Sequence, residues 1–352
     1  MKDDAILRYN ELLKSVDNNQ AVFDKDGEQK ILIIDGTNTF IRCISVNTTI
    51  SESGLHIGGL TGFLMSIAKA IKTLHPNRVI IIFDGKGGSL RRKKLFDQYK
   101  AQRNPRNSPV SKIFGSKEEE LKAISFEMKR LALYLQALPV QTLVIDNIEA
   151  DDAIAYLCTD VFKYDEKIIL STDKDFYQLI NDKTFIWSPM KKMLIDEENI
   201  LENYGFPATN FIIFKALNGD DSDNIPGIKG IGLKTLQKNF GEILGNKISI
   251  DEFINFCEKR NKLSNAFQKV SSEKEKLLLN YKLMQLENVD ISDHTKIIIS
   301  NAIKQPITRL NKFLLQKYML EDSINSQIKD FDGWIKNTWW FLDIYAKELN
   351  SQ

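Results

Sequence analysis

The sequence of 352 residues is poor in the side chains that build zinc sites, disulfide frameworks and histidine-dependent active sites. It contains three cysteines, which lie far apart and form no C-x-x-C pair, and three histidines, none of them at a metal-ligand spacing. A zinc ribbon and a disulfide framework are therefore not expected. The sequence therefore offers few histidines from which a catalytic triad could be built.

Long apolar runs and an excess of either charge are also missing. No stretch of 18 apolar residues occurs, and the polar N-terminus lacks the apolar region of a signal peptide. We therefore expect a cytoplasmic protein without membrane contact, in the host cytoplasm if the source is viral. The 48 basic residues balance 47 acidic ones, so a nucleic-acid surface would have to arise from local segregation of charge.

Four short apolar runs that end in aspartate are the most informative feature present. They span residues 30–35, 78–84, 141–146 and 167–173, are rich in β-branched residues and do not alternate. This pattern is typical of strands buried on both faces of a parallel sheet. A helical pattern at 58–72 completes a β-α-β unit, and 184–196 reads as a final strand with a hairpin. We predict an α/β fold with a mostly parallel central sheet flanked by helices.

Carboxylates accumulate where these runs end. Ligands of open α/β sheets bind at the carboxyl ends of the strands, so these side chains should converge there. They would repel one another unless cations neutralise them, which predicts a divalent metal site. The acidic side chains that gather there are Asp35, Asp84, Asp146, Glu149, Asp151, Asp152, Asp173, Asp175, Asp220, Asp221 and Asp223.

A basic segment follows the second run. Between residues 85 and 117 there are ten lysines and arginines and one acidic residue. A charge run is often only a solvated face. Beside a carboxylate cluster, however, its natural ligand is a phosphodiester backbone, and long loops in compact domains are often functional. Its composition predicts a loop without fixed structure in the absence of nucleic acid.

Residues 227–235 form a second candidate phosphate site, a glycine-rich hairpin between two helices. Its glycines would let a phosphate approach free backbone N–H groups at a helix N-terminus, and Lys229 and Lys234 add positive charge. Such a contact reads no base edge. The alternative is a tight helix-helix turn without a ligand.

Together these motifs resemble the 5′-nuclease (flap endonuclease) superfamily. The likeness is greatest to the free-standing bacteriophage enzymes of the RNase H or 5′-exonuclease type and to the nuclease domains of bacterial repair polymerases. It runs from about residue 30 to 280 and rests on six motifs in the family's order. These are Ile-Ile-Asp-Gly-Thr-Asn at 33–38, Phe-Asp-Gly-Lys at 83–86, Tyr-Lys-Ala-Gln-Arg at 99–103, Glu-Ala-Asp-Asp at 149–152, Ser-Thr-Asp-Lys-Asp at 171–175 and the stretch 219–232.

The resemblance implies a structure-specific hydrolase of phosphodiesters in DNA and in RNA:DNA primers. It would act as a 5′-3′ exonuclease and flap endonuclease in primer removal during replication or repair, and the balance of these activities stays open. Two Mg²⁺ ions, replaceable by Mn²⁺, are implied, with K⁺ at the hairpin. The first ion is assigned to Asp35, Asp84, Glu149 and Asp151, and the second to Asp152, Asp173, Asp175, Asp220 and Asp223. Glu149 and Asp151 can share an ion only if Glu149 precedes a helix that starts near Ala150.

The resemblance also assigns roles to the basic segment, which would form a helical arch over the scissile phosphate. Lys100 and either Arg92 or Arg91 would offset charge developing on the phosphoryl oxygens, with Arg92 preferred. Tyr99 and Phe40 would either stack on an unpaired base or belong to the core. The expected DNA contacts are Gly58, Gly59, Gly62, Tyr99, Arg103, Gly227, Lys229, Gly230, Gly232, Lys234 and Thr235.

We expect three regions: an N-terminal extension at 1–29 that suits one amphipathic helix, a nuclease core at 30–205 with the arch at 86–117, and a helical DNA-binding region at 206–352. The aromatic end at 334–345 is a packing helix or a docking site for a replication partner. Expected partners are DNA with 5′ flaps, nicks or RNA primers, and a single-strand-binding or other replication protein. The chain should be a monomer.

Three other functions compete with this interpretation. A haloacid-dehalogenase-type phosphatase would use residues 35–39 as its nucleophile loop, Ser171, and the acidic motif at 219–223, but would leave residues 149–152, the basic segment and the hairpin without a role. A non-catalytic DNA-binding module would be expected to have lost some carboxylates. A PIN-type RNase is usually much shorter and lacks the hairpin.

Overall fold

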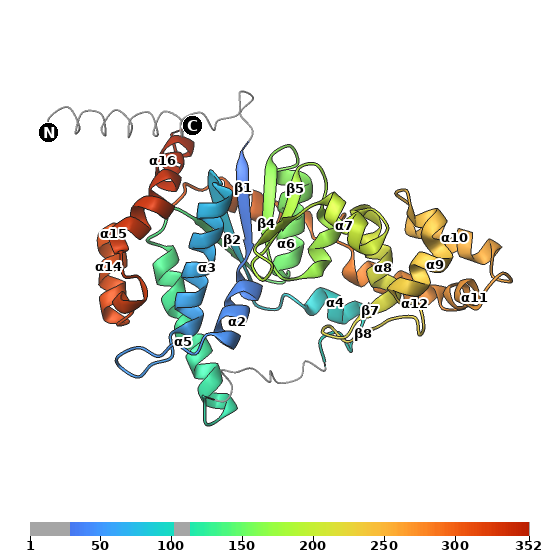
Figure 1. The fold of residues 1–352 in the computed structure, drawn as a ribbon, viewed down its shortest axis with the longest axis horizontal. Helices are drawn as coiled ribbons and strands as arrows, with labels where there is room; N and C mark the ends of the chain where they lie inside the picture. The colour runs from blue at the N-terminus through green and yellow to red at the C-terminus, as the bar shows by residue number, and fades with distance from the viewer. Residues whose placement is uncertain (1–28, 102–112, 352) are drawn as a thin grey trace.

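The computed structural model describes residues 29–101 and 113–351. A six-stranded sheet in the order β3-β2-β1-β4-β5-β6 lies at its centre (Figure 1). All neighbouring strands are parallel except β6, which runs antiparallel to β5. The strands are β1 (Lys30–Asp35), β2 (Arg78–Asp84), β3 (Gln141–Ile145), β4 (Glu166–Leu170), β5 (Thr184–Ser188) and β6 (Met193–Ile195). The predicted α/β fold, the parallel sheet and the final hairpin are confirmed.

The expectation that all four strands are buried on both faces holds for β1, β2 and β4 and is wrong for β3. The first three are buried along almost their whole length. In β3, buried and exposed residues alternate, and Val144 is 60% exposed. β3 is an edge strand, and only one of its faces is covered.

Two layers of helices cover the sheet. One face packs on α2 (Gly36–Val46), α3 (Gly58–Leu74) and α5 (Lys117–Leu135). The other packs on α6 (Ala150–Tyr156), α8 (Phe211–Asn218), α12 (Lys274–Met284) and α13 (Asp293–Ile303). The remaining helices are α4 (Leu90–Leu95), α7 (Glu197–Tyr204), α9 (Leu233–Leu244), α10 (Ile250–Lys259), α11 (Asn265–Ser272), α14 (Lys312–Glu321), α15 (Phe331–Trp334) and α16 (Trp340–Leu349).

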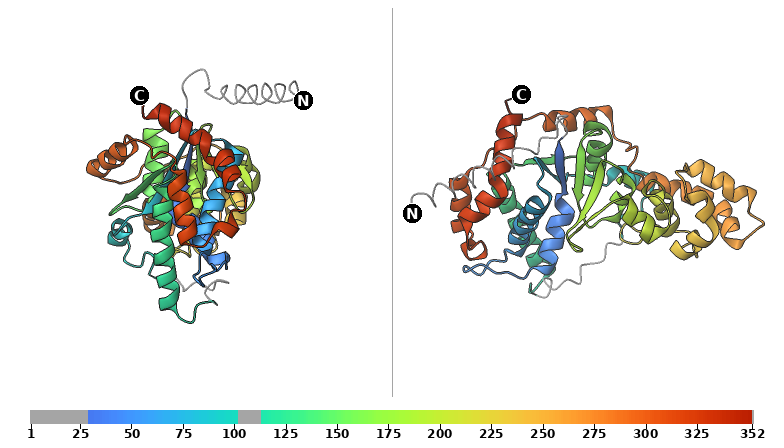
Figure 2. Two further views of the ribbon diagram at one scale, coloured as in Figure 1. Left: turned by 90° about the vertical axis from the view of Figure 1, so that its left-hand side faces the viewer. Right: turned by 45° about the horizontal axis from the view of Figure 1, so that its top comes forward.

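The C-terminal helices lie apart from the helices around the hairpin, with which the predicted DNA-binding region 206–352 groups them (Figure 1). Helices α14 to α16 lie beside α3 and α5, whereas α9 to α11 project from the opposite side of the molecule (Figures 1 and 2). Trp334 and Trp339 are buried in the core beneath α3, and the Asn311 N–H donates to the carbonyl of Ala137, which follows α5. The aromatic end of the chain is therefore a packing element, and the region 206–352 divides between two sides of the fold.

The basic segment is ordered at both of its described flanks. Helix α4 and the turns up to residue 101 pack against the sheet edge, and α5 begins at Lys117 behind an N-cap from Ser116. The expectation of a loop without fixed structure is wrong for these flanks, and residues 102–112 lie outside the described structure. No helix in the described ranges is long and apolar enough to span a membrane.

Candidate active site

The strand ends bring the first carboxylates to one edge of the sheet. Asp35, the last residue of β1, caps α2 by accepting a hydrogen bond of 2.9 Å from the Asn38 N–H. Its other oxygen accepts a hydrogen bond of 3.1 Å from the Ser171 hydroxyl, which follows β4. Asp84, the last residue of β2, accepts from the N–H of Ala150 at 2.9 Å, which ties this strand to the start of α6.

Glu149 lies where the motif spacing requires it. It is the N-cap of α6, in extended conformation with φ −81° and ψ 155°, so it precedes the helix that carries Asp151 in its first turn. The side chain of Glu149 is buried and accepts from Arg92 at 2.8 Å, from the Tyr99 hydroxyl at 2.9 Å and from Lys100 at 2.6 Å. This confirms the predicted local geometry at Ala150.

A second carboxylate group begins with Asp173, just beyond the carboxyl end of β4. Asp173 caps the 3₁₀ turn Lys174–Leu179 (η4) by accepting from the Asp175 N–H at 2.8 Å. Asp220, in the short strand β7 (Gly219–Asp220), accepts from the backbone and hydroxyl of Ser222. Asp175 and Asp220 each lie 2.6 Å from the ammonium of Lys215 on α8. The chain returns through β8 (Ile225–Pro226) toward the hairpin.

One cavity joins the two carboxylate groups. Asp151, Asp175 and Asp223 line it together with Arg92 and Tyr99. The residues come from α6, η4, the β7–β8 turn and the start of the basic segment. The structure therefore brings together carboxylates that are more than 70 positions apart in the sequence.

Burial and mutual repulsion make these carboxylates hard to ionise without a cation. Burial is the main cause that raises the pKa of Asp35 and that of Asp175 to about 7, and the charge of Asp173 adds to both shifts. The pKa of Asp151 is raised by burial first and then by Asp35 and Asp173. Burial also raises the pKa of Asp173, with further contributions from Asp220 and Asp223.

The residues fit divalent cations in donor type and in charge, although the site is not pre-assembled. Within residues 29–101 and 113–351, no three acidic, histidine or cysteine side chains converge as a finished metal site. Lysines and hydrogen bonds hold several of the oxygens instead. The donors are hard carboxylate oxygens, which suit Mg²⁺ and Mn²⁺. In the described residues, the cations of Lys100, Lys215 and Arg92 that contact these eight carboxylates cannot balance their charge.

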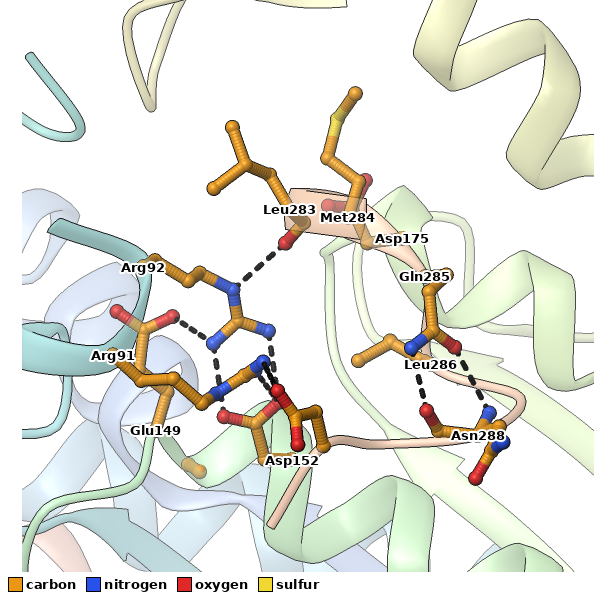
Figure 3. Close-up of polar contacts among 12 residues, drawn as sticks. Arg91, Arg92, Glu149, Asp152, Asp175, Leu283, Met284, Gln285, Leu286 and Asn288 are labelled. Carbon is orange, nitrogen blue, oxygen red and sulfur yellow. Dashed lines mark hydrogen bonds and ion pairs between the residues drawn. The ribbon is translucent and has the colours of Figure 1, made fainter. Parts of the chain in front are cut away.

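Asp152 is not placed as the predicted metal ligand. Its side chain is fully buried and its oxygens accept from Arg91 at 2.9 Å and from Arg92 in a bidentate pair at 2.9 Å (Figure 3). Both guanidinium groups therefore face Asp152. The Arg92 Nε also donates to the carbonyl of Leu283 at the end of α12, at 2.8 Å.

The roles expected of the two arginines need correction for the same reason. Arg92, preferred for the scissile phosphate, is 3% exposed and joins α4, α6 and α12. Its guanidinium is fully engaged, so it acts as a positioning residue for Glu149. Arg91 has a side chain that is 20% exposed, and its pair with Asp152 leaves it at the margin of the site. Spacing along the chain could not separate these two neighbours.

Replacing Arg92 by Ala should lower the free energy of unfolding by about 3–5 kcal/mol, because the buried Asp152 loses its bidentate partner and keeps only Arg91, and one oxygen of Glu149 loses its cation. Urea unfolding measures the change. Arg91→Ala is the matched control, and its effect should be smaller since its partly exposed pair is weaker. If Arg92→Ala kept its stability but lost its activity, Arg92 would instead be assigned to the scissile phosphate.

Lys100 is placed at the centre of the site. Its Nζ lies 2.6 Å from Glu149 and 3.8 Å from Asp223. Its backbone N–H donates to the Asp223 carbonyl at 2.9 Å. The residue has φ +56°, a left-handed conformation that costs a non-glycine residue about 1 kcal/mol or more. The structure therefore holds this ammonium between the first carboxylate group and the β7–β8 turn.

The aromatic candidates for base stacking are core residues. Tyr99 is 2% exposed. Its hydroxyl lies 2.9 Å from a carboxylate oxygen of Glu149 and 2.9 Å from one of Asp223, and it can donate to either. Phe40 is 1% exposed and packs beneath the sheet. Neither ring is open to a base in this conformation, so the structure favours the alternative in which both residues belong to the core. The hydroxyl of Tyr99 instead helps to hold the two carboxylates.

The glycines of α3 are explained by packing and not by DNA. A Cβ on Gly58 would lie 1.9 Å from the carbonyl of Asn47, and one on Gly59 would lie 2.9 Å from Ile44. Both glycines are buried, and the Leu60 N–H at this helix N-terminus donates to Glu127. Gly62 packs in the same way on α2, where a Cβ would lie 3.0 Å from Cys43. These predicted phosphate contacts are therefore not supported.

The hairpin between α8 and α9 keeps the features of a phosphate site. Gly230 has φ +86°, a Cβ on Gly232 would meet no atom within 4 Å, and Lys229 and Lys234 are exposed. The N-cap Gly232 offers no side-chain cap to α9 in the described structure, which leaves N–H donors at this end. Thr235 donates to the Gly230 carbonyl at 3.1 Å, and a Cβ on Gly227 would lie 2.1 Å from the carbonyl of Asn218, so these two residues shape the turn.

Two predicted features cannot be placed. Arg103 and most of the N-terminal extension, residues 1–28, lie outside the described residues. One residue of the site was missed. Lys215 on α8 bridges Asp175 and Asp220, and its position five residues before Asp220 was the only signal in the sequence.

Comparisons with known proteins identify the family of this chain. Residues 30–205 match the family model described as 5′-3′ exonuclease, N-terminal resolvase-like domain. A 5′-3′ exonuclease of Buchnera aphidicola from Acyrthosiphon pisum is 34% identical over 269 residues, which is 73% of this chain and 86% of that protein. A 5′-3′ exonuclease of Aquifex aeolicus is 28% identical over 86% of this chain and 95% of its own length.

A solved structure shows a similar fold. The flap endonuclease of bacteriophage T5, in a complex with DNA and metal ions, matches with a TM-score of 0.57 and 23% identity, over 84% of this chain and 99% of that one. The resemblance to the 5′-nuclease superfamily is confirmed, and the phosphatase alternative is excluded. The chain belongs to the 5′-3′ exonuclease family.

Proposed function

We propose that this protein is a structure-specific 5′ nuclease that uses two Mg²⁺ ions, replaceable by Mn²⁺, to hydrolyse DNA at 5′ flaps, nicks and RNA-primed ends. One observation carries the proposal. Carboxylates from α6, η4 and the β7–β8 turn line one cavity, and the ammonium of Lys100 lies between Asp223, which lines it, and Glu149. Primer removal in replication or repair is the process this activity would serve.

The carboxylates would divide the ions between them. Asp35, Asp84, Glu149 and Asp151 would hold one, and Asp173, Asp175, Asp220 and Asp223 would hold or surround the other. Bound divalent ions supply an activated water and stabilise charge on the phosphoryl oxygens. Lys100 would place a further positive charge near these oxygens. Arg92 and Tyr99 would keep Glu149 oriented without touching the substrate.

The hairpin would bind the duplex by its backbone and by Lys229 and Lys234, so binding should depend on salt and not on base sequence. We also propose that the hairpin binds a K⁺ ion. The carbonyls of Gly227 and Lys229 already accept from Lys276 at 2.7 Å and from Lys269 at 2.9 Å. The ion would therefore have to use other carbonyl oxygens of the turn.

The relatives support the substrate class. The similar bacteriophage protein is named a flap endonuclease and was solved with DNA and metal ions, and the Buchnera and Aquifex relatives are named 5′-3′ exonucleases. A single-strand-binding or other replication protein as partner, a monomeric state and a cytoplasmic location stay predictions.

A panel of labelled substrates tests the proposed function. The purified protein in Mg²⁺ should cut 5′-flap, nicked and RNA-primed duplexes and should leave a matched 3′-flap duplex intact. Product lengths on a denaturing gel distinguish flap removal from stepwise exonuclease action. Equal cutting of 5′ and 3′ flaps, or no cutting of either, would contradict the proposal.

A further inference from the structure

Lys215 occupies an unusual place for a lysine, because it lies inside the second carboxylate group. It projects from α8, and its side chain is 12% exposed. The Nζ lies 2.6 Å from Asp175 Oδ1 and 2.6 Å from Asp220 Oδ2. Because the ammonium of Lys215 contacts two carboxylate oxygens, it places a fixed positive charge between them.

The position of this ammonium conflicts with the binding of a metal ion. A Mg²⁺ bound by these two oxygens would lie roughly 2.0–2.1 Å from each. The Nζ sits at nearly the same point, 2.6 Å from each oxygen. Two cations cannot share this space, and their repulsion would be strong in a partly buried site. One of them must leave when the other arrives.

We infer that Lys215 is the resident counter-cation of the second carboxylate group and must swing away before a divalent ion can bind between Asp175 and Asp220. The inference rests on the proposed two-ion function and deepens it. It makes the second ion the weaker one in the absence of substrate. A scissile phosphate supplies negative charge that can accept the displaced ammonium, so substrate binding and loading of the second ion become coupled.

The alternative is that Lys215 weakens metal binding only as one positive charge among several. Lys174 provides the matched control, because it is an exposed lysine between Asp173 and Asp175 and carries the same charge at the same sheet edge. If only the net charge matters, replacing Lys174 or Lys215 by a neutral residue should change the metal affinity by the same amount. Loss of a competing cation should affect only Lys215.

Calcium titration without DNA tests this directly. Isothermal titration calorimetry should show that Lys215→Met tightens the weaker Ca²⁺ site about tenfold or more, since an ion no longer has to displace a cation. Lys174→Met should change it by less than about twofold, because exposed charges are screened. Lys215→Arg, which keeps the charge, should bind the weaker ion no better than the unaltered protein. Equal gains for both methionine variants, or no gain for either, would overturn the inference.

Thermal unfolding gives a second readout that a merely general charge effect would not produce. In EDTA, Lys215→Met should melt below the unaltered protein, because Asp175 and Asp220 then face each other without a counter-cation. Saturating Ca²⁺ should restore most of that loss. An unchanged melting temperature in EDTA would contradict the inference. Ca²⁺ binding as described, in a protein that cuts no flap substrate, would refute the proposed function and leave this inference standing.

Discussion

Removal of divalent metal, or replacement of Asp173 by Asn, is expected to lower the rate of 5′-flap cleavage by several orders of magnitude. The first change removes the cations, and the second removes one of the buried carboxylates that would bind them. Asp173 and Asp35 lie at adjacent strand ends in the middle of the sheet, and each is close enough to raise the pKa of its neighbours. The loss should exceed that of any single positively charged residue, because the ions supply the attacking water as well as charge stabilisation.

The measurement is single-turnover cleavage in EDTA, followed by addition of excess Mg²⁺ or Mn²⁺, which should restore the full rate. Ca²⁺ should support DNA binding with little turnover. Asp146→Asn is the matched control. Asp146 follows β3 at the same sheet edge, but it is exposed and accepts from the Lys86 N–H at 2.8 Å, outside the cavity. Full activity in EDTA, or equal losses for the two asparagine variants, would refute the assignment of the metal site.

Much of the fold could be predicted because one local pattern fixes both strand position and side-chain placement. A short β-branched run ending in aspartate places that aspartate at the carboxyl edge, whatever the rest of the chain does. This is how Asp35, Asp84 and Asp173 were found. The resemblance assigned Glu149 as a ligand, and helix geometry predicted that it precedes the helix, because only then could it share an ion with Asp151.

The errors concern residues whose role depends on contacts far away in the sequence. Asp152 and Asp151 are neighbours in the chain, yet α6 turns Asp152 toward Arg91 and Arg92 and away from the cavity. Nothing in the motif shows which way each side chain points. The glycines of α3 are ambiguous for a similar reason, because close packing and phosphate binding both require a missing Cβ.

The C-terminal region could not be assigned because helical periodicity shows that a face is apolar but not what covers it. Trp334 and Trp339 bury their rings against α3, on the side of the sheet opposite to the acidic cavity's covering helices. Their partners lie more than 200 positions earlier in the chain. Their amphipathic pattern would be the same on a DNA-binding helix.

Lys100→Ala is expected to reduce the single-turnover rate about 10²–10³-fold, the range typical of losing one preorganised charge-stabilising group. DNA affinity measured in Ca²⁺ should change much less. The reason is geometric. The Lys100 ammonium lies 2.6 Å from Glu149 on a strained backbone that is hydrogen-bonded to Asp223, so its charge would already be in place where the proposed function puts the reacting phosphate. An interaction that grows as charge develops acts on the rate and not on binding.

The control is Lys94→Ala, which removes an exposed lysine from α4 in the same basic segment. It should lower affinity slightly and leave the rate of the bound complex unchanged. The rates must be compared at saturating Mg²⁺, because Lys100 also neutralises Glu149. If Lys100 served only as that counter-ion, its loss would shift the Mg²⁺ concentration needed for half-maximal rate and leave the maximum intact. A large fall in the maximum, with little change in DNA affinity, is therefore the result that assigns Lys100 to the transition state.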